Sequence, residues 1–307
     1  MKITELLNIK YPILQGAMAH ISYAPLVSAV SNAGGLGIIA SGGMTKDELK
    51  KEIIKCKNLT DQPFGVNLML MEKNCDDLVK VILEEKVKII TTGAGSPERY
   101  LETFKKAEII VIPVVSKLKH AIKMEKLGVD AIIVEGSEAG GHIGETSSMV
   151  LIPEISKHIN IPIIAAGGIC DENGLLASIA LGASGIQMGT RFLASHECPA
   201  HINYKNAIIN AKEDSTVVIC KNTGTPVRCL KNNLTDKYFA IEKTPKSLEK
   251  FKKLTIGALK RAVQEGDTLN GSLMCGQIAS NINEILSVND IIQNIMNNYT
   301  KLLSKIK

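Results

Sequence analysis

The feature that most constrains the fold of this chain is a regular alternation of short apolar runs with helix-length segments. Eight such runs occupy residues 13–15, 37–39, 65–68, 89–91, 109–113, 131–135, 163–166 and 186–188. Runs of this length, rich in Ile and Val, are typical of buried strands, and a helical pattern follows each of them. The sequence therefore predicts eight βα units in succession.

Helix-start signals separate the runs. Thr45 with Glu48 forms a capping box ahead of an apolar-periodic stretch, and Asp171 or Asn173 can begin another helix. Eight βα units within about 195 residues predict an α/β protein whose sheet closes into a (β/α)8 TIM barrel. An open doubly wound sheet has the same alternation of strands and helices and is the alternative to a closed barrel. The barrel is favoured because glycine and polar residues follow many of the strands rather than a single switch point.

The alternation of apolar runs with helical segments stops after Ser195. Residues 196–250 are rich in Lys and Asn and contain few long apolar runs, whereas helical patterns return at 250–265, 277–286 and 288–305. We therefore expect a barrel over residues 1–195. Residues 196–307 would form a C-terminal lid or cap segment and additional C-terminal helices, packed on the barrel.

Composition excludes several classes of protein. The formal net charge is +5, from 36 basic and 31 acidic residues. This is too mild for a nucleic-acid-binding face, although it suits an acidic partner. No apolar run is long enough to span a bilayer, and the N-terminus has no signal-peptide pattern. Seven scattered cysteines fit neither a disulfide framework nor a zinc site. We expect a cytoplasmic protein with reduced thiols and no membrane or nucleic-acid partner.

The predicted strands end in residues that can bind a ligand. In a barrel, the carboxyl ends of all strands meet at one mouth, where phosphate commonly binds after strands seven and eight. Gly167-Gly168 and Gly189-Thr190 stand at those two ends. Without a Cβ, their backbone N–H groups can approach an anion closely. The alternative is that these glycines only permit tight βα turns.

His142 is the candidate acid or base of this mouth. Glycines on both sides place its imidazole on a loop, and an imidazole titrates near neutral pH. Glu135, Glu138 and Asn67 should line the same mouth, which weakens the alternative of an ordinary surface histidine. A further cluster, Met18, Met69 and Met71, is either core filler or a flexible apolar slot.

Taken in order, these segments resemble the nitronate monooxygenase superfamily, which consists of FMN-binding TIM barrels. The similar segments are 15–18, 33–37, 64–67, 138–142, 166–169 and 187–191; the resemblance covers residues 11–205 and resumes at Gly276-Gln277. Within the superfamily, Thr91-Thr92-Gly93-Ala94-Gly95 and Glu135 are most similar to the FabK-type, FMN-dependent enoyl-acyl-carrier-protein reductases. The monooxygenases tend to carry an aromatic-rich segment and a Gln at these places. Pro226-Val227-Arg228 is also similar to the reductase lid.

The resemblance implies a role for each matching position. Gly16, Ala17 and Met18 would contact the flavin ring, and Asn67 and Glu135 would hydrogen-bond the ring or ribityl chain. Gly140 and Gly141 would border the cofactor, and Gly167, Gly168, Gln187, Met188, Gly189 and Thr190 would hold its phosphate end. His142 would be catalytic. As in some relatives, a monovalent cation would lie near Leu193, Ser195 and Glu197.

The implied reaction is reduction of trans-2-enoyl-acyl carrier protein by NADH or NADPH in fatty-acid elongation, a ping-pong hydride transfer through flavin N5. His142 would donate a proton or polarise the thioester carbonyl. The resemblance also implies a homodimer. Acidic acyl carrier protein would be the partner, and the lysine-rich segment 231–253 is either its docking surface or simply solvated. Two alternatives stay open: a nitronate monooxygenase with His142 as base, and a non-catalytic barrel that binds FMN or another phosphate.

Overall fold

The main part of the molecule is a closed ring of eight parallel strands. The computed structural model describes residues 2–306 except 243 and 245–246. The barrel strands are β1 (Ile13–Gln15), β2 (Gly37–Ala40), β3 (Phe64–Met69), β4 (Ile89–Gly93), β5 (Ile110–Val115), β6 (Ile132–Glu135), β8 (Ile163–Ala166) and β9 (Gly185–Met188). They follow the order β1-β9-β8-β6-β5-β4-β3-β2. A parallel bridge between Leu14 and Leu36 joins the two ends of this row. The predicted TIM barrel is therefore confirmed, and the open-sheet alternative is wrong because no strand is left as an edge.

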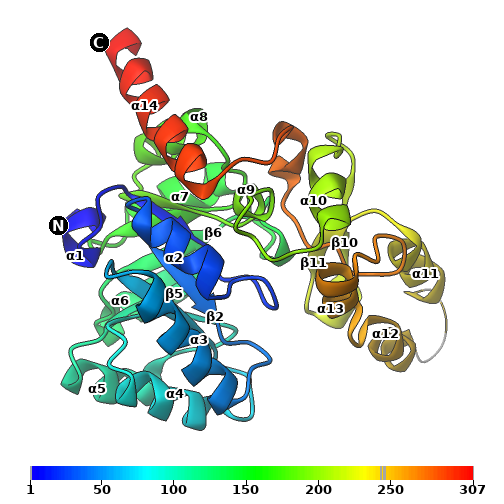
Figure 1. The fold of residues 1–307 in the computed structure, drawn as a ribbon, viewed down its shortest axis with the longest axis horizontal. Helices are drawn as coiled ribbons and strands as arrows, with labels where there is room; N and C mark the ends of the chain where they lie inside the picture. Colours follow the sequence, from blue (N-terminus) through cyan, green and yellow to red (C-terminus); the bar gives the residue numbers. More distant parts are fainter. Residues whose placement is uncertain (1, 243, 245–246, 307) are drawn as a thin grey trace.

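Helices cover the outside of the barrel (Figure 1). They are α2 (Ala24–Asn32), α3 (Lys46–Leu59), α4 (Cys75–Glu84), α5 (Glu98–Lys106), α6 (Leu118–Leu127), α7 (Ser148–Ser156) and α8 (Glu172–Ala180). The short α1 (Ile3–Leu7) instead packs on the inward-facing strand residues, because Ile3 and Leu7 belong to the same buried cluster. The short α9 (Thr190–Leu193) follows β9 directly. The predicted capping box of Thr45 and Glu48 begins α3. Asp171, rather than Asn173, caps α8 by accepting from the Gly174 N–H.

Two apolar clusters follow the alternation of the strands. Ile38 and Ile133 belong to a cluster inside the barrel, whereas Ile39 and Ile132 belong to a larger cluster between the strands and the helices. Successive side chains of a strand point to opposite faces. Glu135 therefore shares the inward face of β6 with Ile133, one layer nearer the mouth.

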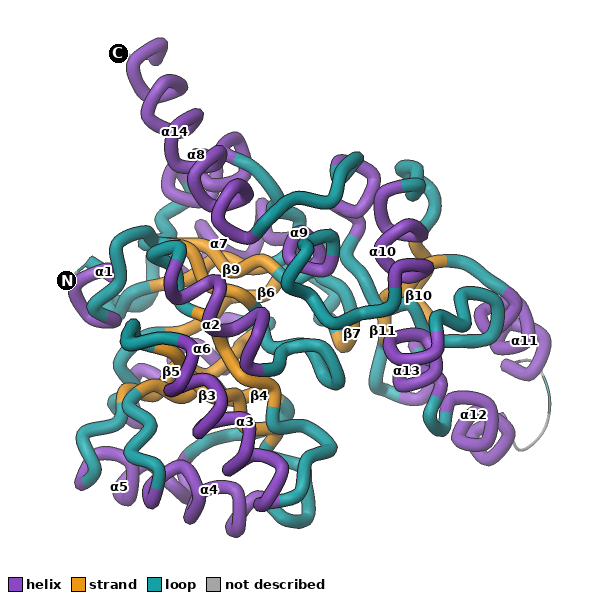
Figure 2. The backbone as a smooth tube through the Cα atoms, viewed as in Figure 1, coloured by secondary structure: helices purple, strands orange, loops and turns teal. Residues whose placement is uncertain are grey.

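The lid is built around a small antiparallel sheet, in the order β10-β11-β7 (Figure 2). Its strands are β7 (Gly141–His142), β10 (Thr216–Ile219) and β11 (Val227–Leu230), and its helices are α10 (Ile202–Ile209), α11 (Asn233–Glu242), α12 (Ser247–Thr255) and α13 (Ala258–Lys260). A 3-10 turn at Lys221–Thr223 and a π-helical turn at Arg261–Glu265 complete it. β7 comes from the loop that follows barrel strand β6, so one barrel loop is part of the lid sheet.

The C-terminal segment returns to the barrel. The predicted helix at 288–305 is confirmed as α14 (Val288–Ile306), which packs against α2 and α8. The helix predicted at 277–286 is wrong: only a 3-10 turn forms at Gln277–Asn281. Leu286 instead pairs with Ser195 in a parallel bridge, so tertiary partners replace helical hydrogen bonds. The helix predicted at 250–265 is interrupted at Gly257, whose φ is +69°. No helix in the described ranges is both long and apolar enough to cross a membrane.

Candidate active site

The ends of β1 and β9 form one side of the barrel mouth. The Gly16 N–H donates to the Met188 carbonyl at 2.9 Å. A Cβ on Gly16 would lie 3.3 Å from the Gln187 side chain, and one on Gly189 would lie 3.6 Å from the Met18 sulfur. The structure thus brings these predicted cofactor-binding positions together, with Ala17 between Gly16 and Met18 along the chain.

A buried hydroxyl holds this first loop in place. Ser22 Oγ accepts from the Met18 N–H at 2.8 Å and from Gln15 Nε2 at 2.8 Å. Gln15 Oε1 in turn accepts from the Ile38 N–H at 3.1 Å. Both polar side chains are fully buried, so their hydrogen bonds fix the loop that would lie against a flavin ring. Sequence reasoning missed Ser22, because only the tertiary fold places it beside the end of β1.

Asn67 and Glu135 face the inside of the mouth. Asn67 Nδ2 donates to Thr91 Oγ1 at 2.9 Å, which orients the amide across neighbouring strands. The Glu135 carboxyl has no hydrogen-bond partner within the described part of the chain. Desolvation raises its pKa from the ordinary 4.5 to about 8. At neutral pH this carboxyl is therefore mostly protonated and can donate a hydrogen bond into the mouth.

Glu138 lies beside the glycine turn after β8, and its carboxylate is bound at the start of a helix. A Cβ on Gly168 would lie 3.4 Å from the Glu138 Cβ. The carboxylate accepts from the backbone N–H of Ser148 at 3.0 Å and from Ser148 Oγ at 2.7 Å. An acidic group at this position stabilises the N-terminus of α7. The sequence does not show this second contact, because it depends on the loop folding back onto the start of the next helix.

Gly167-Gly168 after β8 and Gly189-Thr190 after β9 stand at the two strand ends where phosphate is expected, and we call these four residues the phosphate cradle. Gly167 and Gly168 have φ values of +94° and +75°, a region that favours glycine. A Cβ on Gly167 would lie 3.1 Å from the Ala139 nitrogen and 3.1 Å from the Gly136 carbonyl oxygen. The turn after β8 therefore lies directly against the loop after β6, and a side chain at Gly167 would crowd that contact.

Gly276 connects the cradle to the lid. Its N–H donates to Thr190 Oγ1 at 2.9 Å, and a Cβ on it would lie 2.7 Å from the Glu138 carbonyl oxygen. A Cβ on Gly140 would lie 2.4 Å from the Cys275 carbonyl carbon. Only glycines permit this close approach of two backbones. Because Thr190 Oγ1 already accepts from Gly276, its own proton is free to point at an anion.

His142 stands on the lid strand β7, opposite Val227 of β11. The residue is exposed, but the surrounding protein partly desolvates its ring and lowers its pKa below the usual 6.5. Arg228, 8% exposed, pairs with Gly141 of this strand and also binds the loop before it, since its Nε and Nη2 donate to the Ser137 carbonyl at 3.1 and 3.0 Å. Burial thus favours the neutral form of the imidazole, and pairing with β11 holds the residue on a strand.

The residues expected near a monovalent cation are already engaged by the protein. The Ser195 carbonyl accepts from Lys205 Nζ at 2.7 Å. The Glu197 carboxylate accepts from the Val288 N–H at 3.0 and 3.1 Å, at the start of α14. Leu193 is buried in α9. This donor set does not fit a bound cation, because a lysine ammonium and a helix N-terminus take its oxygen atoms.

The mouth fits FMN. Gly167 and Gly168, both with positive φ, form the turn after β8, and Thr190 after β9 offers a hydroxyl to an anion. Asn67 and the unpartnered Glu135 carboxyl face the interior, where a flavin ring or ribityl chain would need polar partners. Nothing lies within 4 Å of a Cβ built on Gly93, so the mouth is open beside β4.

The three methionines Met18, Met69 and Met71 do not pack together as one part of the core. Met71 is 77% exposed, whereas Met69 lies near Gly42 and Met18 near Gly189. Met71 is therefore not core filler, and Met18 belongs to the mouth.

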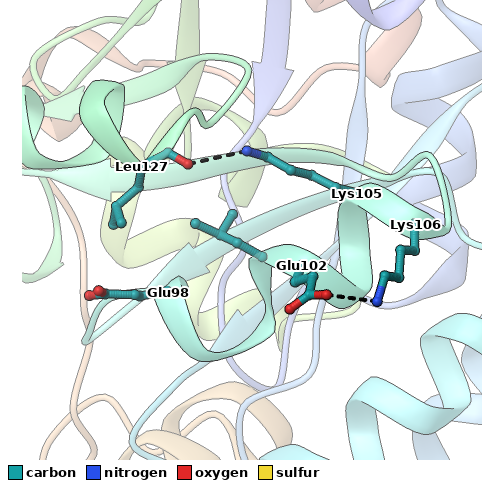
Figure 3. Close-up of a pocket in the computed structure, with 6 residues that line it drawn as sticks. Glu98, Glu102, Lys105, Lys106 and Leu127 are labelled. Carbon is teal, nitrogen blue, oxygen red and sulfur yellow. Dashed lines mark hydrogen bonds and ion pairs between the residues drawn. The ribbon is translucent and has the colours of Figure 1, made fainter.

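A separate surface groove of about 590 Å³ lies between α5 and α6 (Figure 3). Its lining residues are Glu98, Leu101, Glu102, Lys105, Lys106 and Leu127. Lys105 donates to the Leu127 carbonyl at 3.2 Å, and Lys106 pairs with Glu102 at 2.7 Å. The two lysines stand at the end of α5, which leads into β5, so this groove reaches toward the end of the barrel opposite the mouth.

A closed parallel barrel with such a mouth is an architecture that can bind FMN. The profile of the nitronate monooxygenase family matches residues 1–79 and 73–298, and the chain belongs to this family of FMN-dependent enzymes. The resemblance predicted from the motifs is therefore confirmed.

Individual relatives refine this picture. A solved structure of FabK from Thermotoga maritima superposes with a TM-score of 0.96 at 45% identity, covering 99% of this chain and 97% of that one. A "(3aS,4S,5R,7aS)-5-hydroxy-7a-methyl-1-oxo-octahydro-1H-indene-4-carboxyl-CoA dehydrogenase" of Mycobacterium tuberculosis is 40% identical over 76% of this chain and 67% of its own length. A "Probable nitronate monooxygenase" of Staphylococcus saprophyticus is 34% identical over 99% of both chains.

Proposed function

We propose that the protein is an FMN-dependent enoyl-acyl-carrier-protein reductase that takes its electrons from NADH or NADPH. The observation that carries this proposal is the likeness to FabK over almost the whole of both chains. Two features of the mouth support it, namely Glu135 at the end of β6 and the small residues at the end of β4.

The open side of the mouth suits a thioester substrate. Gly93 ends β4, and the space beside it is empty for 4 Å. A large side chain there would narrow the entrance, whereas a long acyl thioester needs a wide one. The carboxyl-CoA dehydrogenase among the relatives is named for a thioester as well.

FMN, when bound, supplies a group that accepts a hydride from one substrate and passes it to another. The protein's own residues bind and orient FMN and the substrate, and they protect the reaction from water. Thr190 and the Gly167-Gly168 turn would hold the phosphate end, and Glu135 and Asn67 would offer hydrogen bonds to the ring or ribityl chain. The His142 ring N–H would donate to the thioester carbonyl and polarise it. In sum, the enoyl β-carbon gains a hydride and the α-carbon gains a proton from solvent, while NAD(P)H becomes NAD(P)⁺.

We further propose that the substrate arrives on acyl carrier protein and that two copies of the chain form a dimer. The lysine-rich lid segment 231–253 supports an acidic partner. In the described part of this segment, Lys231 lies 3.5 Å from Asp214, Lys237 is bonded to Asn270 and Lys250 to Thr244, and Lys253 is exposed. Lys243 and Lys246 of this segment lie outside the described residues.

Nitronate oxidation is the second candidate. The family match and the relative from Staphylococcus saprophyticus support it. The lowered pKa of His142 supports it as well, because a neutral imidazole can take the α-proton of a nitroalkane and so form the nitronate that is then oxidised. In this reaction oxygen would be the electron acceptor.

One anaerobic experiment separates the candidates. The FMN-saturated protein is mixed with NADH or NADPH, and the oxidised flavin absorbance is followed. Rapid bleaching, with recovery of colour on adding an enoyl thioester, is expected for the reductase. Bleaching by a nitronate but not by either nicotinamide would replace this proposal with nitronate oxidation. No bleaching by any donor would indicate a non-catalytic flavin-binding barrel.

A further inference from the structure

Lys205 is a buried lysine whose hydrogen-bond partners are carbonyl oxygens. It lies on α10 in the lid and is 8% exposed. Its Nζ donates to the Ser195 carbonyl at 2.7 Å and contacts the His196 carbonyl at 3.5 Å. A buried charge is costly unless its surroundings satisfy it. Backbone carbonyl oxygens satisfy this ammonium in the way that they coordinate monovalent cations.

The carbonyls that Lys205 holds belong to the connection between the barrel and the lid. Ser195 follows α9, the short helix that begins at Thr190 in the phosphate cradle. Ser195 Oγ donates to the Phe192 carbonyl at 2.8 Å, and Ser195 also pairs with Leu286 in a parallel bridge. The ammonium thus fixes the segment that leaves α9 and the segment that leads into α14.

A free cation would have little left to bind here. The Glu197 carboxylate is directed at the Val288 N–H, at the start of α14. Arg191 donates to the carbonyls of Ala194 and Glu284, at 3.0 and 2.9 Å, so these oxygens are also engaged. The oxygen atoms around Ser195 are therefore satisfied by cationic side chains of the protein itself.

We propose that the Lys205 ammonium serves as a built-in monovalent cation. It is a positioning residue: it holds the Ser195 and His196 carbonyls and, through α9, the phosphate end of the FMN site. The protein therefore needs no added K⁺, Na⁺ or NH₄⁺ to bind FMN. This inference concerns cofactor binding and does not depend on which substrate is reduced or oxidised.

The wild-type protein provides the first test. FMN affinity, measured by quenching of flavin fluorescence, and the unfolding temperature are compared in chloride salts of K⁺, NH₄⁺, Na⁺ and choline at equal ionic strength. We expect the dissociation constants to agree within about twofold, because the charge is already in place. A saturable gain in FMN affinity from K⁺ or NH₄⁺ over choline would overturn the proposal.

Variants of Lys205 provide the second test, with Lys212→Met as the matched control on an exposed lysine of the lid. Lys205→Met retains the bulk of the side chain but leaves the two carbonyls unsatisfied. We expect its FMN dissociation constant to rise about tenfold in every salt. Lys205→Ala should lose as much FMN affinity in choline chloride, and NH₄⁺ or K⁺ should restore that affinity. If Lys205→Met binds FMN as the control does, the proposal is wrong. If neither variant folds, the wild-type salt series decides.

Discussion

The hydroxyl of Thr190 accepts a hydrogen bond from the backbone N–H of Gly276, 86 residues further along the chain. The next residue, Gln277, donates its N–H to the Glu138 carbonyl at 2.9 Å. One short segment therefore contacts both the phosphate cradle and the loop that leads to His142. This arrangement links cofactor binding to the position of the lid strand.

Thr190→Val should weaken FMN binding. The variant has the same shape but cannot donate to the phosphate, and it leaves the buried Gly276 N–H without an acceptor. Losing these interactions should raise the FMN dissociation constant about 10- to 100-fold. Thr190→Ser keeps the hydroxyl and is the control. Equal FMN affinities of Thr190→Val and Thr190→Ser, measured by fluorescence titration, would show that the Thr190 hydroxyl does not hold the phosphate.

The Glu135 carboxyl should make stability depend on pH. Its pKa is about 8 in the folded protein and 4.5 ordinarily. Between these values the folded state holds a proton that the unfolded state has released, so stability falls as pH rises from about 4.5 through 8. Glu135→Gln removes this loss, which amounts to at most about 5 kcal/mol at about 1.4 kcal/mol per pKa unit.

The measurement is the unfolding temperature of both proteins without FMN, from pH 5 to pH 8. The advantage of Glu135→Gln over wild type should grow across this range. If the difference in unfolding temperature between the two proteins stays constant with pH, the Glu135 carboxyl titrates normally.

His142→Ala should impair turnover while leaving FMN binding intact. The imidazole is exposed on β7, so its removal should change stability by no more than about 0.5 kcal/mol. Burial lowers the pKa of the ring below the usual 6.5, so the ring is protonated only in more acidic solution. The imidazolium is a stronger donor to the thioester carbonyl than the neutral ring, so we expect wild-type kcat/KM for the enoyl thioester to rise as the pH falls from 7 toward 5. The same rise in the His142→Ala variant would assign the titration to another group.

Arg228→Lys should loosen the lid strand. The guanidinium donates twice to the Ser137 carbonyl and once, at 3.1 Å, to Thr216 Oγ1. A lysine cannot make this planar, forked set of bonds. We expect a loss of roughly 1–3 kcal/mol in the free energy of unfolding and a lower kcat with nearly unchanged FMN affinity. Arg261→Lys, on a more exposed arginine that pairs with Asp267 at 3.8 Å, is the control. Equal stability of the two variants would contradict the assigned role.

The sequence alone determined the barrel. Its eight apolar runs are local signals, and each lies where a barrel strand forms, because a buried parallel strand needs a continuous stretch of apolar residues. The ends of those strands must meet at one mouth once the barrel closes. For this reason Gly16, Asn67, Glu135, Gly167 and Thr190 could be placed near one another before any contact was known.

Only the tertiary structure decided how the lid completes the site. β7 has two residues, too few for a periodic signal, and forms because Gly141 and His142 pair with β11, some 85 residues away. Leu286 ends the predicted helix 277–286, yet it pairs with Ser195 after α9. The partners of Lys205 are backbone carbonyls, which leave no trace in side-chain identity. Such contacts depend on long-range packing, which competes with local propensity and here prevails over it.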